Sequence, residues 1–320
     1  MSAKKIILDC DPGHDDAIAI LLMLASQKEI ECLGITVSAG NVSLNLTATN
    51  SLKVLSLAKN TSLSVYKGCP RPLIKPLVTA EHVHGETGLD TGSGNSLPKP
   101  LKEPNQEHAV NFIIKTLNNS QKGEITLVAT GPLTNIAAVL AMDPVAFSKA
   151  KQLIIMGGAG FEPGNITPAA EFNIFVDPHA ARSVFESGID IVMFGLDVTH
   201  QMIITPERLK SLSKSSKNIG PVISDLLTFF NSYDTKKYGW SGAPLHDPCT
   251  IAWLIDPDIF KGRKMSVRIE TNEGPAYGRT IADWFNTTDE FKNVYVITHG
   301  DSNKFFKLLT SRFKFFDNEK

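Results

Sequence analysis

Short apolar runs rich in β-branched residues alternate with longer stretches of helical periodicity along most of this 320-residue chain. Such alternation is typical of a parallel sheet with helices on both faces. Strands are predicted at Ile6–Leu8, Ile30–Val37, Val65–Tyr66, Ile125–Ala129, Leu153–Met156, Ile191–Phe194 and Val294–Thr298. Helices are predicted at Ala17–Ala25, Ser43–Lys59, Ala109–Leu117, Leu133–Ala141, Pro178–Glu186 and from Asn303 onward. We therefore expect an α/β fold built on an open, mostly parallel, Rossmann-like sheet.

Two long segments and one helical region interrupt this alternation. Between Thr79 and Pro104 the pattern stops in a stretch rich in glycine and serine, and Gly157–Asn173 forms a second long loop. Long loops in compact enzymes are usually functional or mobile. The region from Pro206 to Tyr238 is predicted to be helical without strands, and its helices could form a lobe over a site.

The remaining C-terminal segments predict one more helix and a hairpin. The helix is predicted over Ala243–Leu254, with His246 and Asp247 in its first turns. The runs Lys264–Thr271 and Tyr277–Ala282 flank a Gly-Pro turn and predict a hairpin, which gives the sheet a small antiparallel edge. Because no linker or internal repeat divides the chain, we expect a single domain over residues 1–320.

Composition narrows the classes of function. The net charge is -1 with both signs interspersed, which argues against nucleic acid as a partner and favours a small neutral substrate. The four cysteines lack metal-finger spacing and are interpreted as buried thiols of a reducing compartment: Cys10, Cys32, Cys69 and Cys249. The first predicted strand leaves no room for a signal peptide, and no apolar run is long enough to span a bilayer. We expect a cytoplasmic protein without a membrane partner.

Four carboxylates gather where the first predicted strand ends, at Asp9, Asp11, Asp15 and Asp16. Like charges repel, so this grouping requires a cation or a polyhydroxylated ligand. The helix macrodipole would explain Asp15 and Asp16 but not Asp9 and Asp11. Adjacent residues on a helix diverge by about 100°, so we expect one of Asp15 and Asp16 to hold a cation and the other to bind something beside it.

Polar residues follow the other predicted strands as well. In a parallel sheet these loops share one edge, so their side chains should converge in a single cleft. The candidates are Asn41, His84, Thr130, Met156, Glu171 and Asn173, joined from a later helix start by His246 and Asp247. Carboxylates and a backbone carbonyl are hard oxygen donors, which suit calcium rather than zinc. We therefore expect Ca²⁺ as the cofactor.

The segment Asp9-Cys10-Asp11-Pro12-Gly13-His14-Asp15-Asp16 resembles the signature of the inosine-uridine preferring nucleoside hydrolases, a family of calcium-dependent N-ribohydrolases. Matching segments recur at Val37–Asn41, Leu127–Asn135, Met156–Gly158, Gly164–Thr167, Ala170–Asp177 and His246–Cys249. The resemblance implies metal coordination by Asp11, Asp16, Asp247 and the main-chain carbonyl of Thr130. It implies binding of sugar hydroxyls by Asp15, Asn41, Met156, Asn165, Glu171 and Asn173.

The same resemblance implies an activity and an assembly. Family members hydrolyse the N-glycosidic bond of ribonucleosides with a calcium-activated water, and Asp11 would accept the proton of that water. We expect a role in nucleoside salvage or catabolism. A homodimer or homotetramer is also implied, although no interface residue can be chosen from the sequence.

The end of the site that receives the base is less well defined. His246 is the first candidate for the leaving-group acid, because it adjoins Asp247 and a pKa near neutrality would let it deliver a proton. His84 is the second candidate, and His82 is expected to be structural. Three aromatic residues in or just after the helical region are candidates to stack on the base or to donate a hydrogen bond to it: Tyr233, Tyr238 and Trp240. The choice between purine and pyrimidine stays open.

Three other classes of protein remain as alternatives. A non-catalytic, calcium-dependent ribose- or nucleoside-binding protein would keep Asp15 and Asn173 but needs no base. An aspartate-based phosphotransferase also starts with a strand ending in Asp-x-Asp, but Pro12-Gly13-His14 does not supply the Thr or Val pattern that should follow. Phosphorolysis would require a basic phosphate pocket, and Arg279, in the predicted hairpin, is the one basic residue near the cleft motifs.

Overall fold

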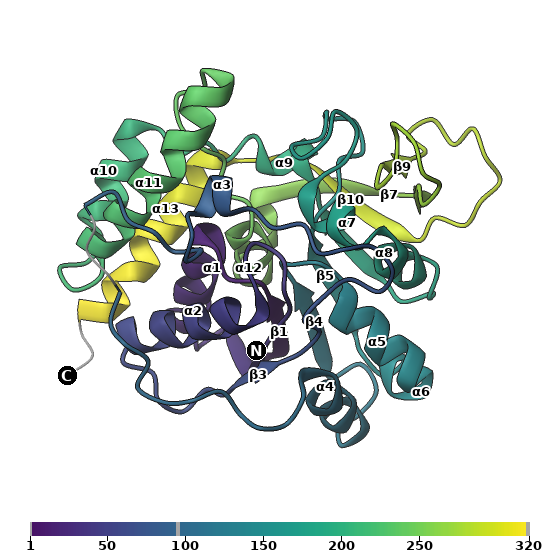
Figure 1. Ribbon diagram of the computed structural model, residues 1–320, viewed down its shortest axis with the longest axis horizontal. Helices are drawn as coiled ribbons and strands as arrows, with labels where there is room; N and C mark the ends of the chain where they lie inside the picture. Colours follow the sequence, from purple (N-terminus) through teal and green to yellow (C-terminus); the bar gives the residue numbers. More distant parts are fainter. Residues whose placement is uncertain (1, 94–96, 318–320) are drawn as a thin grey trace.

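An eight-stranded sheet forms the centre of the computed structural model, which describes residues 2–93 and 97–317 (Figure 1). The strand order is β3-β2-β1-β4-β5-β6-β10-β7, and β7 alone among these strands runs antiparallel to its neighbour. The strands are β1 (Lys4–Cys10), β2 (Ile30–Val37), β3 (Val65–Lys67), β4 (Ile125–Ala129), β5 (Gln152–Met156), β6 (Ile191–Phe194), β7 (Phe260–Met265) and β10 (Val294–Gly300). The predicted open and mostly parallel sheet is confirmed.

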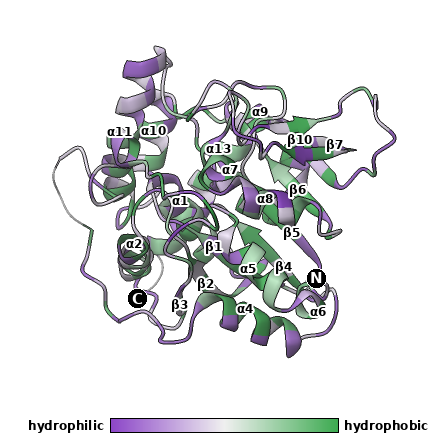
Figure 2. Ribbon diagram, turned by 45° about the vertical axis from the view of Figure 1, so that its right-hand side comes forward, coloured by the Kyte–Doolittle hydropathy of each residue, from purple (hydrophilic) through white to green (hydrophobic). Residues whose placement is uncertain are grey.

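Helices cover both faces of the sheet. One face packs against α1 (His14–Leu24), α2 (Leu44–Leu57), α10 (Pro206–Ser213), α11 (Gly220–Tyr238), α12 (Pro248–Ile255) and α13 (Ser302–Phe313). The other face packs against α4 (Ala109–Asn118), α5 (Thr134–Met142), α6 (Pro144–Phe147) and α8 (Pro178–Phe185). Alternate residues of β1 enter the two cores: Ile6 and Leu8 lie in the first, and Ile7 lies in the second. The apolar strands therefore lie between two helical layers (Figure 2).

Short helices lie in the loops: α3 (Glu81–His84), α7 (Phe172–Val176), α9 (Leu196–Thr199) and the 3₁₀ turns Pro257–Ile259 and Lys314–Asp317. The first two fall in segments that were expected to be loops. Each is only four or five residues long, which is too short to show helical periodicity.

The helix predicted over Ala243–Leu254 begins later, at Pro248. Ahead of it the chain is held in an extended form, because Ile204 donates a backbone hydrogen bond to Ala243 and Leu245 donates one to Met202. Pro248 then occupies the first helical turn, where its missing N–H is tolerated.

The predicted hairpin is only partly correct. The run Lys264–Thr271 divides: β7 joins the edge of the main sheet beside β10, while β8 (Val267–Ile269) pairs with β9 (Thr280–Ala282) in a separate two-stranded sheet. The division falls at Met265–Val267, where three consecutive residues are buried. A flat strand cannot bury three successive side chains on one face, so the chain turns there.

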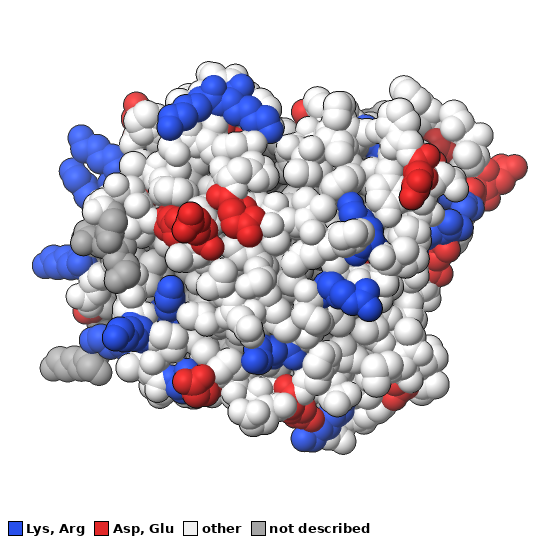
Figure 3. Space-filling view, viewed as in Figure 1, with Lys and Arg blue, Asp and Glu red and all other residues white. Residues whose placement is uncertain are grey.

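The strand order reverses between β1 and β4, because β2 and β3 lie on one side while β5 and β6 lie on the other. Ligands of open α/β sheets bind outside the carboxyl ends of the strands at such a switch point. Acidic and basic side chains are interspersed over the face drawn in Figure 3. Within the described ranges, no helix combines the length and the apolar character needed to cross a membrane.

Candidate functional site

A cavity of about 250 Å³ lies at the carboxyl edge of the sheet. Most of the residues predicted from the sequence line it: Asp15, Asn41, His84, Thr130, Met156, Asn165, Glu171, Asn173, Tyr233, Tyr238, Trp240, His246 and Asp247. Asp11 and Asp16 are fully buried, and each is hydrogen-bonded to a residue of the cavity wall. Residues from the whole length of the chain thus meet at one place.

Three carboxylates converge beside the cavity. One oxygen each of Asp15, Asp16 and Asp247 lies within 4.8 Å of the other two. The side chains of Asp15 and Asp16 both hydrogen-bond to Asp247. Two carboxylates can approach this closely only if a proton or a cation lies between them. Although Asp15 and Asp16 are adjacent on α1, both side chains therefore reach Asp247, and which of the two would hold a cation stays a prediction.

Asp11 adds a fourth carboxylate with one oxygen fixed and one free. Its Oδ2 accepts a hydrogen bond from the backbone N–H of Asn41 at 2.6 Å. Its Oδ1 is buried without a hydrogen-bond partner in the described part of the chain. Glycines flank the group because a Cβ at Gly40 or Gly131 would collide with the carboxylate. A buried oxygen without a partner is the kind of group that a cation or a water molecule satisfies.

Burial and mutual repulsion shift the acidity of the cluster. Burial, followed by the charge of Asp16, raises the pKa of Asp11 well above its usual range. Burial and then Asp15 raise the pKa of Asp16 to about 7. The pKa of Asp247 is also raised well above its usual range, first by burial and then by Asp15. These hard oxygen donors fit a divalent cation such as Ca²⁺, because its charge would offset both effects.

Glu171 is placed by the start of α7. Its carboxylate accepts backbone hydrogen bonds from Gly158 at 2.8 Å, Asn173 at 2.9 Å and Ile174 at 3.2 Å. It therefore caps the helix and holds the end of β5 at the same time. Burial raises its pKa above the ordinary value, although these amides lower it in part.

Asn173 joins the carboxylate cluster to the strand ends. Its side-chain amide donates to the carbonyl of Thr130 at 2.8 Å and to that of Met156 at 3.1 Å. The hydroxyl of Thr130 donates to Asp16 Oδ1 at 2.7 Å. Thr130, whose carbonyl is predicted to bind metal, is therefore held by hydrogen bonds at both its carbonyl and its side chain. Because the amide nitrogen of Asn173 is occupied, its carbonyl oxygen is left to accept a ligand hydroxyl.

Histidine rings form one wall. His84 lies at the end of α3, where it stacks on His14 with ring centroids 5.4 Å apart. The backbone N–H of His14 donates to His84 Nδ1 at 3.3 Å. Burial, followed by the charge of His14, lowers the pKa of His84 well below its usual range. His84 is therefore a neutral ring, which weakens it as a proton donor at neutral pH.

Aromatic rings line a further stretch of the cavity wall. Tyr238 stacks on Trp240 at 4.9 Å between centroids, and Trp240 meets the edge of His200 at 5.0 Å. His82 contacts Tyr233 edge-on at 5.4 Å and lines the cavity. His82 thus borders the cavity, and its expected structural role stays a prediction. These rings offer flat surfaces of the kind that stack on a planar ligand.

His246 lines the cavity just ahead of α12, in the extended segment rather than in a helical turn. Its Nδ1 lies 2.8 Å from the hydroxyl of Thr199 on α9. Burial, followed by the charge of His200, lowers the pKa of His246 to about 3. The expectation of a pKa near neutrality is therefore wrong, because the ring is enclosed by protein.

Sequence reasoning missed three polar residues of the cavity, namely Glu162, His200 and Asp234. Asp234 has a helical signal, because it shares one face of α11 with Phe230 and Tyr238 at spacings of four, and all three line the cavity. Burial raises the pKa of Asp234 to about 6. Glu162 and His200 pair at 3.7 Å from separate loops, and no sequence spacing connects them.

Known proteins share this fold and sequence. A family model described as inosine-uridine preferring nucleoside hydrolase matches residues 6–307. The pyrimidine-specific ribonucleoside hydrolase RihA of Shigella boydii is 45% identical over 315 residues, which cover 98% of this chain and 99% of that protein.

Solved structures agree with these matches. The purine-preferring ribonucleoside hydrolase from Gardnerella vaginalis superposes with a TM-score of 0.88 at 33% identity, over 97% of this chain and 98% of its own. The plant nucleoside hydrolase PpNRh1 superposes with a TM-score of 0.89 at 34% identity, over 97% and 99%. Because the matches span nearly the whole chain, they confirm the resemblance noted in the sequence. The chain belongs to the family of inosine-uridine preferring nucleoside hydrolases.

Proposed function

We propose that this protein hydrolyses the N-glycosidic bond of ribonucleosides to free base and ribose, with a calcium ion at the carboxylate cluster. The observation that carries the proposal is the composition of the cavity. The cavity is lined both by carboxylates and amides, as ribose hydroxyls require, and by aromatic rings, as a nucleobase requires. The products suit nucleoside salvage or catabolism.

The residues at the carboxylate end would hold the ion and accept the proton. Asp11, Asp16, Asp247 and the Thr130 carbonyl are the ligands that the resemblance implies. Of these, Asp16 and Asp247 converge with Asp15 in the structure. When bound, calcium supplies positive charge that makes nearby water more acidic. Asp11 accepts the proton of the attacking water, because its Oδ1 has no hydrogen-bond partner in the described part of the chain and is left to face a water molecule.

The polar residues around the cluster bind and orient the sugar. Cleavage builds oxocarbenium character on the ribose, so carboxylates near the ring stabilise the transition state. The proposed hydroxyl-binding residues are Asp15, Asn41, Met156, Asn165, Glu171 and Asn173. Because the backbone and neighbouring side chains already fix Glu171 and Asn173, their binding geometry is set before the substrate enters.

At the base end, we assign His246 to the leaving group as a neutral ring. Because the hydroxyl of Thr199 occupies Nδ1, Nε2 is the nitrogen left to face the base. With a pKa of about 3, the ring is neutral at pH 7 and carries a single N–H. It therefore contributes by donating a hydrogen bond from Nε2 to the base. Tyr233, Tyr238 and Trp240 would stack on the base.

Pyrimidine ribonucleosides are the proposed preferred substrates. The 45% identity to a pyrimidine-specific relative supports this choice over the 33% identity to a purine-preferring one. The substrate preference can be tested on four nucleosides: inosine, uridine, cytidine and adenosine. The protein should release free base and reducing sugar in phosphate-free buffer, fastest from uridine and cytidine.

The same assay separates the alternatives. A nucleoside-binding protein without activity would bind the panel and release no sugar. A phosphorylase would need added phosphate and would yield a sugar phosphate. Faster release from inosine than from uridine would overturn the pyrimidine assignment alone, whereas no release from any member would overturn the hydrolase proposal.

A further inference from the structure

One loop of the pocket wall is held from outside the pocket. Residues 160–170, here called the 160–170 loop, follow β5 and contribute to the cavity wall Glu162, Pro163, Gly164, Asn165 and Ile166. The loop contains no strand or helix. Its backbone groups therefore need partners from other elements if the wall is to keep its shape.

Arg279 supplies partners for the carbonyl groups of this loop. Its Nη1 donates to the carbonyl oxygens of Glu162 at 2.8 Å and Ala169 at 3.0 Å, and its Nη2 donates to Gly160 at 3.0 Å. One guanidinium thus joins both ends of the loop. This use of a planar, forked donor suits arginine and cannot be reproduced fully by the single nitrogen of lysine.

Asp197 supplies partners for the amide groups of the same segment. From α9, its Oδ2 accepts from the N–H of Gly160 at 2.8 Å, and its Oδ1 accepts from Phe161 at 2.6 Å and Glu162 at 2.9 Å. The carboxylate is about nine-tenths buried. The Arg279 guanidinium therefore binds backbone carbonyls of the loop, and the Asp197 carboxylate binds its backbone amides.

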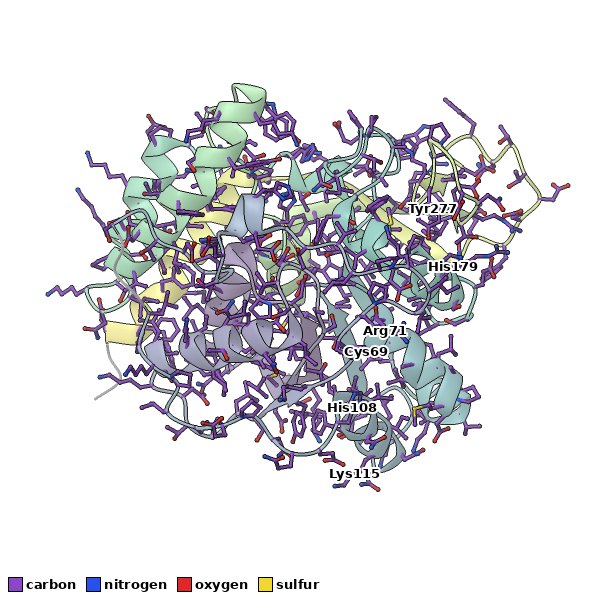
Figure 4. All side chains as sticks on the ribbon, viewed as in Figure 1. Cys69, Arg71, His108, Lys115, His179 and Tyr277 are labelled. Atoms are coloured by element: carbon purple, nitrogen blue, oxygen red, sulfur yellow. The ribbon has the colours of Figure 1, made fainter. Side chains whose placement is uncertain are left out.

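The turn that presents Arg279 is itself anchored. Tyr277 precedes Arg279 in this turn and His179 lies on α8 (both are labelled in Figure 4), and the Tyr277 hydroxyl lies 3.5 Å from His179 Nδ1. Lys75 Nζ lies 3.4 Å from the centre of the Phe175 ring and 5.3 Å from that of Tyr277. The guanidinium is therefore carried by a segment that is packed against the body of the protein.

We propose that Arg279 is a positioning residue for substrate binding: with Asp197 it clamps the 160–170 loop and keeps Glu162 and Asn165 in place on the pocket wall. The inference rests on the proposed function only in taking the ligand at this wall to be a ribonucleoside. The clamp matters for Asn165 because the loop sets the direction of its side chain. The Oδ1 of Asn165 accepts a hydrogen bond from the N–H of Phe172 at 3.0 Å, so its amide nitrogen is left to donate to a ligand.

Three variants test the clamp: Arg279→Met, Arg279→Lys and, as a matched control, Arg263→Met. Arg263 is also partly buried, lies close to the same two-stranded sheet and donates to a backbone carbonyl, that of Trp284. It overlies the Trp284 ring, which meets Phe161 edge-on, but no hydrogen bond in the described part of the chain joins Arg263 itself to the 160–170 loop. The measurements are kcat and KM for uridine, and amide hydrogen exchange of the peptide spanning residues 159–171.

Arg279→Met should raise KM by ~10-fold or more while kcat changes by less than ~3-fold, because it removes binding contacts and not reacting groups. In the same variant, amide hydrogen exchange of the loop should become faster. Arg279→Lys should show a smaller rise in KM and a smaller increase in exchange, and Arg263→Met should change neither quantity. An unchanged KM, a loss confined to kcat, or an equal KM rise in Arg263→Met would overturn the proposal. If the unmodified protein hydrolyses no nucleoside, the proposed function fails, and the exchange result alone then decides whether the clamp exists.

Discussion

Asp11 combines the two properties that a proton acceptor requires, namely a fixed position and a free oxygen. Its carboxylate was singled out from the sequence because it lies beyond the strand and the macrodipole does not explain it. The sequence also placed His246 near the ligand carboxylate. Its low pKa was not predictable, because it depends on enclosure by residues distant in the chain, including His200.

Replacing Asp11 with Asn should lower kcat on uridine by at least ~100-fold, since an amide cannot accept the proton of the attacking water. The free energy of unfolding of the metal-free protein should rise, because one of the repelling buried charges is removed. Steady-state kinetics and thermal unfolding measure the two effects. Retention of more than a tenth of the activity would remove Asp11 from its proposed role.

Asp234 gives a pH-dependent prediction. Burial raises its pKa to about 6, so its contribution to stability is fully present below its unfolded pKa of 3.8 and is lost as the pH rises through about 6. In the metal-free protein, Asp234→Asn should raise the Tm by ~2 °C or more at pH 8 and leave it unchanged near pH 4. The exposed Asp258→Asn is the control. A Tm difference independent of pH would contradict the assignment.

At the scale of elements, hydrophobic patterning predicted the strands, which are apolar on both faces of the sheet, and the long helices, which bury an apolar face. It missed α9, whose four residues hold both Asp197 and Thr199 against the pocket. The start of α12 was also misplaced, because the pairing of Ala243 with Ile204 is a tertiary contact. The sequence thus predicted the loops that line the pocket, but not α9 or the extended segment before α12, which stabilise the pocket wall.

The segments after β1, β2 and β5 bring together the polar groups assigned to ribose, and this gives a prediction about the sugar. A 2′-deoxyribonucleoside should react at least ~100-fold more slowly than its ribonucleoside, because buried groups at Asp15, Glu171 or Asn173 would lose a partner. The comparison of kcat/KM for uridine and 2′-deoxyuridine measures this. Equal values would show that these residues bind something other than the 2′-hydroxyl.

At the scale of the whole molecule, the alternation of strands and helices was enough to predict the fold class and the edge at which the site lies. The homodimer or homotetramer implied by the resemblance stays a prediction. Light scattering at micromolar concentration should show at least a dimer, and a monomer alone would contradict it. The cytoplasmic location also stays a prediction.

The central claim is that the buried carboxylates hold a calcium ion on which hydrolysis depends, and one titration tests it most directly. Chelator-treated protein is supplied with increasing Ca²⁺ while release of uracil from uridine is followed. We predict negligible release without metal and full recovery at about one bound Ca²⁺ per chain, since the carboxylates of Asp15, Asp16 and Asp247 converge on one site. Full activity in protein shown by elemental analysis to be free of divalent metal would contradict the claim.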